Sequence, residues 1–144
     1  MRKFKRWPCL LLFLGIFLLV SGMSGFGKAP DKIPTPASDF TVVLIDQADV
    51  RAEVSMFSIN GFTYFPGYKG KGAFSIPFEN LESVEFRLIN ENLEAVVNLK
   101  QGQAITLQAD RSLDCYGRTN FGTFQIKLGD IKQLFIKGLS PSAD

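Results

Sequence analysis

Two stretches of the chain, fifty positions apart, follow the same pattern. Residues 72–86 read GAFSIPFENLESVEF, and residues 122–136 read GTFQIKLGDIKQLFI. Each has a glycine, a segment of alternating apolar residues, a polar corner opened by Asn80 or Asp130, and a second apolar segment. Alternation with a period of two is typical of half-buried β-strands. The repeat therefore predicts a β-fold made from two related units.

The correspondence pairs residues of like kind at eight positions. These pairs are Gly72 with Gly122, Phe74 with Phe124, Ile76 with Ile126, Phe78 with Leu128, Asn80 with Asp130, Leu81 with Ile131, Val84 with Leu134, and Phe86 with Ile136. The period grows to 54 if Val43 is set against Val97, with the extra residues of the first copy around 62–70. We interpret residues 43–89 and 93–137 as a duplication. The alternative is two ordinary hairpins that look alike.

The duplication has a physical reason in the packing of sheets. A single unit of this size has one apolar face and nothing to cover it, whereas two units can bury their faces together. The hundred residues of 40–139 suffice for one core of that kind. We therefore expect a single all-β domain over 40–139, an antiparallel sandwich or a small barrel built from two similar halves. Neither copy has a helical period longer than one turn.

The first residues have the composition of an export signal. Four basic residues within positions 2–6 precede an apolar run over 10–20, and small residues follow it. This order predicts a signal peptide over 1–26 and a periplasmic or secreted protein. The alternative is an uncleaved membrane anchor at 10–26, close to the lower limit of about 17 residues for a span. Residues 27–39, which are rich in proline, are expected to be a linker.

The basic character of the whole chain comes from its head. The chain has 16 basic and 14 acidic residues, and without the four basic residues of the head its net charge falls from +2 to −2. This balance argues against nucleic acid as a partner. Contact with a membrane is expected only through the N-terminal segment, if that segment is not cleaved. No asparagine stands in an Asn-x-Ser/Thr acceptor, which favours a bacterial envelope.

Histidine is absent, and only Cys115 remains after the head. The chain thus lacks the commonest general base near neutral pH and the usual ligands of zinc. We expect no catalytic residues, no metal and no cofactor, so the chain is predicted not to be an enzyme. Cys115 is interpreted as a small buried apolar residue, with an intermolecular disulfide as the alternative.

An enzyme that uses carboxylates alone is the remaining catalytic possibility. Asp46 and Asp49, or Asp110 and Asp114, could approach each other across turns and act as a pair. Acidic residues in turns more often bond the nearby backbone and face water. We therefore interpret these four residues as turn residues.

One stretch of ten residues combines aromatic and basic side chains. Because alternation buries only one side of a strand, some of these aromatic residues are expected to be exposed, where aromatic rings beside cations make good contact points. The predicted binding residues are Phe62, Tyr64, Phe65, Tyr68, Lys69 and Lys71. The alternative is that Phe62 and Tyr64 belong to the core, that Phe65 covers a strand end, and that the lysines solubilise a bend.

These observations predict an exported, non-catalytic β-module of a bacterial cell envelope. Its expected role is interaction with a protein partner, or assembly with copies of itself. The alternative is a β-barrel that binds a small ligand or a glycan, with the aromatic loop at its rim.

Overall fold

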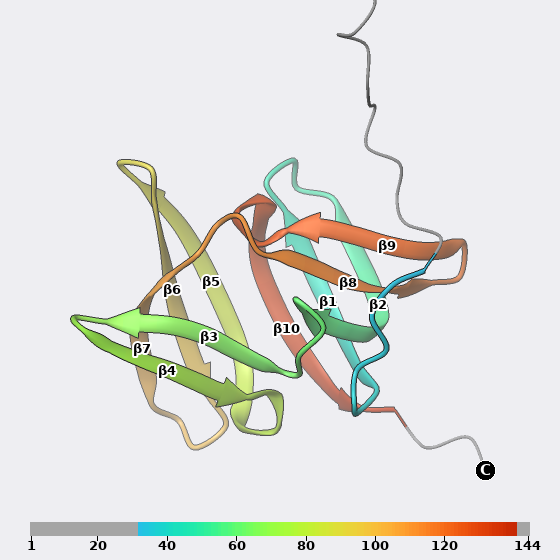
Figure 1. Cartoon of the computed structure of the whole chain (residues 1–144), viewed down its shortest axis with the longest axis horizontal. Helices are drawn as coiled ribbons and strands as arrows, with labels where there is room; N and C mark the ends of the chain where they lie inside the picture. Colours follow the sequence, from blue (N-terminus) through green and yellow to red (C-terminus); the bar gives the residue numbers. More distant parts are fainter. Residues whose placement is uncertain (1–31, 141–144) are drawn as a thin grey trace, which may run out of the picture.

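The protein folds into one curled antiparallel sheet. The computed structural model describes residues 32–140, which form ten strands and two short 3₁₀ helices. The strand order is β4-β3-β7-β6-β5-β10-β1-β2-β8-β9, and the sheet bends into a half-barrel (Figure 1). The elements are β1 (Phe40–Asp46), β2 (Arg51–Ile59), β3 (Tyr64–Lys69), β4 (Gly72–Pro77), η1 (Phe78–Asn80), β5 (Leu81–Ile89), β6 (Asn92–Leu99), β7 (Ala104–Ala109), β8 (Asp114–Thr119), β9 (Gly122–Lys127), η2 (Leu128–Asp130) and β10 (Ile131–Leu139). The all-β expectation is confirmed.

The sheet is symmetric about its centre. Each half has five strands, with a 3₁₀ helix before the last, and the strand order reads the same from both ends when β1–β5 are exchanged with β6–β10. At the centre β5 pairs with β10, and Val84 lies opposite its own counterpart Leu134. Ser83 opposite Phe135 and Glu85 opposite Gln133 complete the symmetric register. A local two-fold axis therefore passes between Val84 and Leu134.

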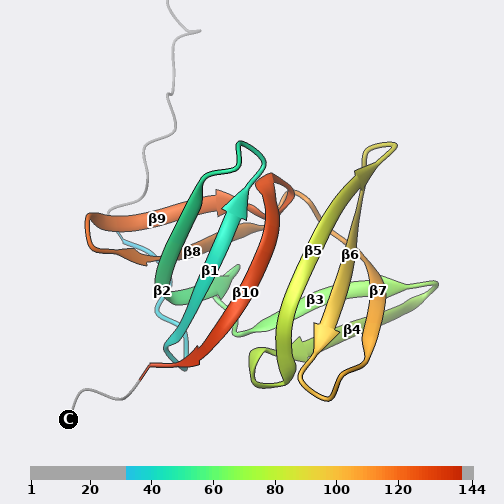
Figure 2. The same cartoon turned by 180° about the vertical axis from the view of Figure 1, so that it is seen from behind.

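The two halves exchange hairpins. The β1–β2 hairpin of the first half lies between β10 and β8 of the second, and the β6–β7 hairpin of the second lies between β5 and β3 of the first. Figure 2 shows β10 between β1 and β5 on the back of the molecule. The halves thus bury their apolar faces as parts of one continuous sheet, so of the two expected forms, sandwich and small barrel, the structure is nearer to the barrel.

The pairing corrects the alignment of the first strand of each half. Leu44 lies opposite Leu134 in one half, and Val97 lies opposite Val84 in the other. Leu44 is therefore the counterpart of Val97, an offset of 53 positions and not 54. Residues 42–44 are all apolar, so alternation does not show which of them corresponds to Val97, and only the ladder of pairs does.

The extra residues of the first half also lie elsewhere than expected. Val54 and Leu107 are counterparts, because they pair with the equivalent residues Val42 and Ala95. Tyr64 follows Val54 by ten positions, whereas its counterpart Asp114 follows Leu107 by only seven. The insertion therefore lies between Val54 and Tyr64, before β3 and not in the β3–β4 hairpin, in a region where β2 is bulged between Ser55 and Ser58 against β8.

One hydrophobic core fills the concave side of the sheet. Phe78 and its counterpart Leu128 are both fully buried, and the ring of Phe78 meets Phe40 edge-on at 5.4 Å and stacks on Phe57 at 5.9 Å between centroids. The repeated residues Phe74 and Phe124 occupy equivalent places on the outermost strands, opposite Gly67 and Gly117. The repeat in the sequence thus corresponds to a repeat in space.

The segment before β1 packs on the folded body. Pro36 is buried, Pro34 lies against Gly61, and Asp39 accepts a hydrogen bond of 2.8 Å from the backbone N–H of Met56. The packed body therefore starts before Phe40, within the stretch expected to be a linker. The predicted signal or anchor over 1–26 and the start of the linker lie outside the described residues. Across residues 32–140 we find no helix with the length and apolar character of a membrane span.

Gly117 lies where β8 passes closest to β2. A Cβ at Gly117 would overlap Val54 Cγ1 and lie 2.9 Å from the backbone oxygen of Ser55. We expect Gly117→Ala to lower the free energy of unfolding by about 1–3 kcal/mol, the usual cost of overpacking. Urea unfolding measures the change.

Gly72→Ala is the matched control for this substitution. The nearest atoms to a Cβ at Gly72 are 3.5 Å away, which is ordinary contact. We expect its midpoint to stay close to that of the parent protein. Equal losses for the two alanine variants would contradict the close approach at Gly117.

Candidate functional site

A pocket of about 200 Å³ opens on the outer side of β3. Phe65 and Gly67 are buried on the core side of β3, so the alternate residues Tyr64, Pro66 and Tyr68 face the other way. The wall of the pocket consists of Ile59, Asn60, Phe62, Tyr64, Pro66, Tyr68, Asp110 and Leu113. Three of the six predicted binding residues, Phe62, Tyr64 and Tyr68, therefore lie together.

The aromatic side of the pocket is held by a tight turn. Ile59 and Phe62 form a β-bridge with two backbone hydrogen bonds of 2.9 Å, and between them Asn60 and Gly61 have φ of 54° and 86°. Positive φ at both central residues is the mark of a type I′ turn, which an Asn-Gly pair favours. Phe62 is 51% exposed, and its ring stacks on Tyr64 with centroids 5.1 Å apart and planes 26° apart. Tyr68 is 54% exposed.

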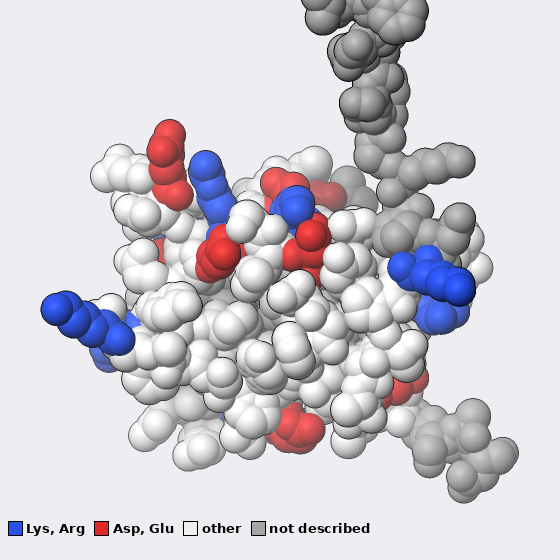
Figure 3. Space-filling model, in the orientation of Figure 1, with Lys and Arg blue, Asp and Glu red and all other residues white. Residues whose placement is uncertain are grey.

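The other three predicted residues lie outside this pocket. Phe65 is fully buried and packs against Phe86 with ring centroids 6.0 Å apart, so it cannot contact a partner. The strand turns Phe65 to the core because it alternates with Tyr64. Lys69 borders a separate groove of about 630 Å³ between β4 and the β6–β7 turn, and Lys71 is exposed in the β3–β4 turn. Figure 3 shows the side of the molecule on which β3 and β4 lie. Its charged side chains lie mainly in the upper part and at the sides, and its centre is largely uncharged.

A carboxylate completes the pocket. Asp110 Oδ1 accepts hydrogen bonds from the backbone N–H of Ser112 at 2.9 Å and from its hydroxyl at 2.6 Å. These bonds, that of the hydroxyl first, lower the pKa of Asp110 below its ordinary value. Asp110 is thus a turn residue, as expected, and in addition it borders the aromatic residues.

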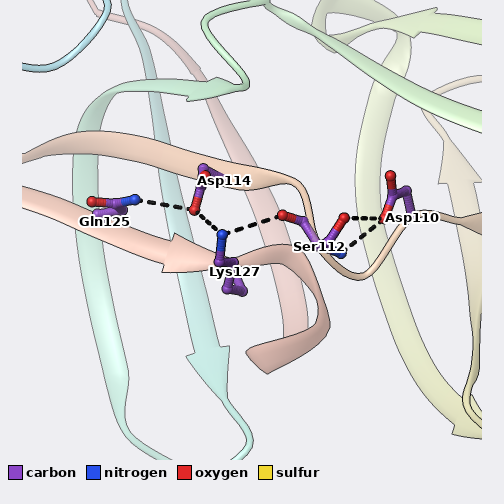
Figure 4. Close-up of polar contacts among 5 residues, drawn as sticks. All are labelled: Asp110, Ser112, Asp114, Gln125 and Lys127. Atoms are coloured by element: carbon purple, nitrogen blue, oxygen red, sulfur yellow. Dashed lines mark hydrogen bonds and ion pairs between the residues drawn. The ribbon is translucent and has the colours of Figure 1, made fainter. Parts of the chain in front are cut away.

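Polar contacts continue from Ser112 along the second half (Figure 4). Lys127 Nζ lies 3.4 Å from the backbone oxygen of Ser112 and 2.8 Å from Asp114 Oδ1, which also accepts from Gln125 at 3.0 Å. The ammonium of Lys127, and then Gln125, lower the pKa of Asp114, while Asp114 raises the pKa of Lys127. Lys127 and Asp114 therefore compensate each other's charge.

The pocket lies where a turn of the first half meets a turn of the second. Asn60 and Asp110 both border it, and the N–H of Asn60 donates to the backbone oxygen of Asp114 at 2.7 Å. The repeat predicts two related halves, but it does not show which turns come together. The sequence therefore carries no signal that places Asp110 beside the aromatic residues.

Strands β3 and β8 are equivalent but carry different chemistry. The pattern of burial is the same over residues 63–68 and 113–118. At two of the matching positions, however, tyrosines of the first half are replaced by charged residues: Tyr64 by Asp114 and Tyr68 by Arg118. The same scaffold therefore folds without aromatic residues at these positions.

Asp46 and Asp49, the other two acidic turn residues predicted above, bond partners outside the pocket. Asp46 Oδ1 accepts the N–H groups of Ala48 and Val50, at 2.8 and 2.9 Å, and Asp49 pairs with Lys132 at 2.7 Å. Both lie around the β1–β2 turn, far along the chain from Asp110 and Asp114. The part of the chain that the structure describes holds no cluster of three His, Cys, Asp or Glu residues able to bind a metal ion.

Cys115 is the counterpart of Phe65 and lies in the core. Burial raises the pKa of its thiol far above the ordinary value. In the folded chain Cys115 is therefore an inert apolar residue, and its burial excludes it from an intermolecular disulfide.

The fold and the pocket together define a small two-fold β-module with an aromatic pocket. A family model described as "uncharacterised protein" matches residues 36–138, so the chain belongs to that family. The match begins at Pro36, the buried residue before β1. No curated protein and no solved structure matches the chain.

Proposed function

We propose that the protein is a non-catalytic, exported β-module of a bacterial cell envelope that binds a protein partner through the aromatic pocket of β3. Export is supported by the basic head and the apolar run of residues 10–20. Binding is supported by Phe62 and Tyr68, two half-exposed aromatic side chains that border one pocket. Aromatic residues of this kind dominate the energetics of protein interfaces.

The observation that carries the proposal is the contrast between the two halves. An exposed aromatic residue that the fold requires should recur in both halves, because their backbones and burial match. Tyr64 and Tyr68 do not recur, since their counterparts are Asp114 and Arg118, and Phe62 belongs to the stretch between Val54 and Tyr64 where the first half has extra residues. The fold therefore does not require these exposed residues to be aromatic, and contact with a partner explains why they are.

A test of this proposal replaces Phe62 and Tyr68 together by serine. We expect crosslinking in intact producing cells to capture the partner, or a second copy of the chain, roughly tenfold less with this variant, as truncation of interface aromatics does. The melting temperature should change little, because both side chains are half exposed.

The control replaces Val50 and Leu88 by serine. These two residues are exposed to a similar extent, 57% and 55%, but neither borders the pocket. Crosslinking should stay at the parental level. If the two double variants lose crosslinking equally, or if neither loses any, the pocket is not the binding surface.

A second candidate function is the binding of a glycan or a small molecule. It is favoured by the stacked pair of Phe62 and Tyr64 beside the polar groups of Asn60 and Asp110, an arrangement that suits a sugar ring. Under this reading, a glycan at a hundred times its Kd should stabilise the protein by about 2.7 kcal/mol. A thermal-shift panel of envelope glycans distinguishes the two functions.

A further inference from the structure

We propose that the pocket receives a cationic side chain of the partner, arginine above lysine, between the aromatic rings and the carboxylate of Asp110. This inference rests on the proposed function, because it names the chemistry of the group that the same pocket binds. The partner would present the cation from an extended or looped segment of its chain.

The pocket carries a negative charge. Its wall contains one carboxylate, that of Asp110, and no lysine or arginine. The nearby ammonium of Lys127 is paired with Asp114 at 2.8 Å. The charge on Asp110 is therefore not compensated within the wall, and a cation from outside would compensate it.

Ser112 holds the carboxylate of Asp110 in place. Both hydrogen bonds from Ser112 end on Oδ1 of Asp110. Within residues 32–140 no hydrogen bond or ion pair to Oδ2 of Asp110 is found, so this oxygen can accept from a bound donor. Ser112 also keeps the pKa of Asp110 low, so the carboxylate stays charged at neutral and mildly acidic pH.

The aromatic side chains of the pocket wall also favour a cation. A cation over the face of an aromatic ring is attracted by the electrons of the ring, and a planar guanidinium also stacks on it. Phe62, Tyr64 and Tyr68 supply such faces, and Pro66 between the tyrosines adds an apolar floor. A volume of about 200 Å³ suits one large side chain and excludes a folded element. Arginine fits both the rings and the carboxylate.

The test compares two small probes that differ in charge. N-acetyl-arginine amide and N-acetyl-citrulline amide have nearly the same shape, but only the first is a cation. Each probe is titrated into the protein in the form isolated from the cells that produce it. NMR follows the side-chain resonances of Tyr64 and Tyr68. We expect the arginine probe to bind roughly tenfold more tightly, from one cation–π contact and one exposed ion pair.

Two variants distinguish the effect of the Asp110 carboxylate on probe binding from the effect of the net charge of the protein. Asp110→Asn keeps an oxygen that can accept from Ser112 and should remove most of the difference between the two probes. Glu91→Gln, in the β5–β6 turn, removes the same charge outside the pocket and should leave the difference intact.

Because the pKa of Asp110 is lowered in the folded protein, binding of the arginine probe should be kept in mild acid and lost only as the pH falls through that pKa.

Each outcome decides the inference. Equal binding of the two probes, or an unchanged difference in Asp110→Asn, would overturn the cation site. It would leave the proposed function standing if crosslinking still depends on Phe62 and Tyr68. Binding of neither probe at high concentration would also overturn it. Crosslinking that is indifferent to Phe62 and Tyr68 would remove the proposed function itself.

Discussion

Residues 36–90 and 91–140, produced as two separate chains, are expected to be largely unfolded alone and to form the sheet when mixed. The reason is the exchange of hairpins. Without the second half, β1 loses its pairing with β10, and β3 loses its contact with β7. Each fragment would also expose the core face of its strands. Circular dichroism and size-exclusion chromatography of each fragment and of the mixture measure the result.

The cut at 90/91 does little harm of its own. Asn90 and Glu91 form the turn between β5 and β6, and both have positive φ, so no strand is interrupted. The uncut chain over 36–140 serves as the reference for the spectrum of the mixture. A monomeric fragment of 36–90 with a cooperative unfolding transition would contradict the interleaved arrangement.

Phe78→Ala is expected to lower the free energy of unfolding by about 3–5 kcal/mol, the usual cost of emptying a buried aromatic site. Phe78 is fully buried, and its ring contacts those of Phe40 and Phe57. A domain has only about 5–15 kcal/mol of stability in total, so this one change removes a large part of it. Urea denaturation followed by circular dichroism gives the value.

Phe74→Ala provides the matched control, four residues earlier in the same repeat. Its side chain is 41% exposed on the outermost strand β4, so less apolar surface returns to water. We expect a loss of about 1 kcal/mol or less. If Phe74→Ala and Phe78→Ala were equally destabilising, the difference in burial between the two side chains would not set their contribution to stability.

Three residues of the candidate site were predictable from the sequence, because alternation buries only one side of a strand and leaves some of a dense group of aromatic residues exposed. The same prediction also included Phe65, which is core. Alternation divides β3 into two sets, Tyr64 with Tyr68 and Phe65 with Gly67, but both sets contain an aromatic residue. Only the strands packed around β3 decide which set faces the core. Asp110 was seen as a turn residue, and its place beside Phe62 depends on a contact across 48 positions of sequence.

By itself, the sequence determined the strands and the two similar halves, because both are encoded locally: alternation sets which residues can share a face, and Gly, Asn and Asp set the turns. The tertiary structure alone decided that β1–β2 and β6–β7 change places between the halves, and that the turns of Asn60 and Asp110 meet. These features depend on partners more than forty residues apart. Such partners are selected when the whole sheet closes over one core, and no local pattern names them.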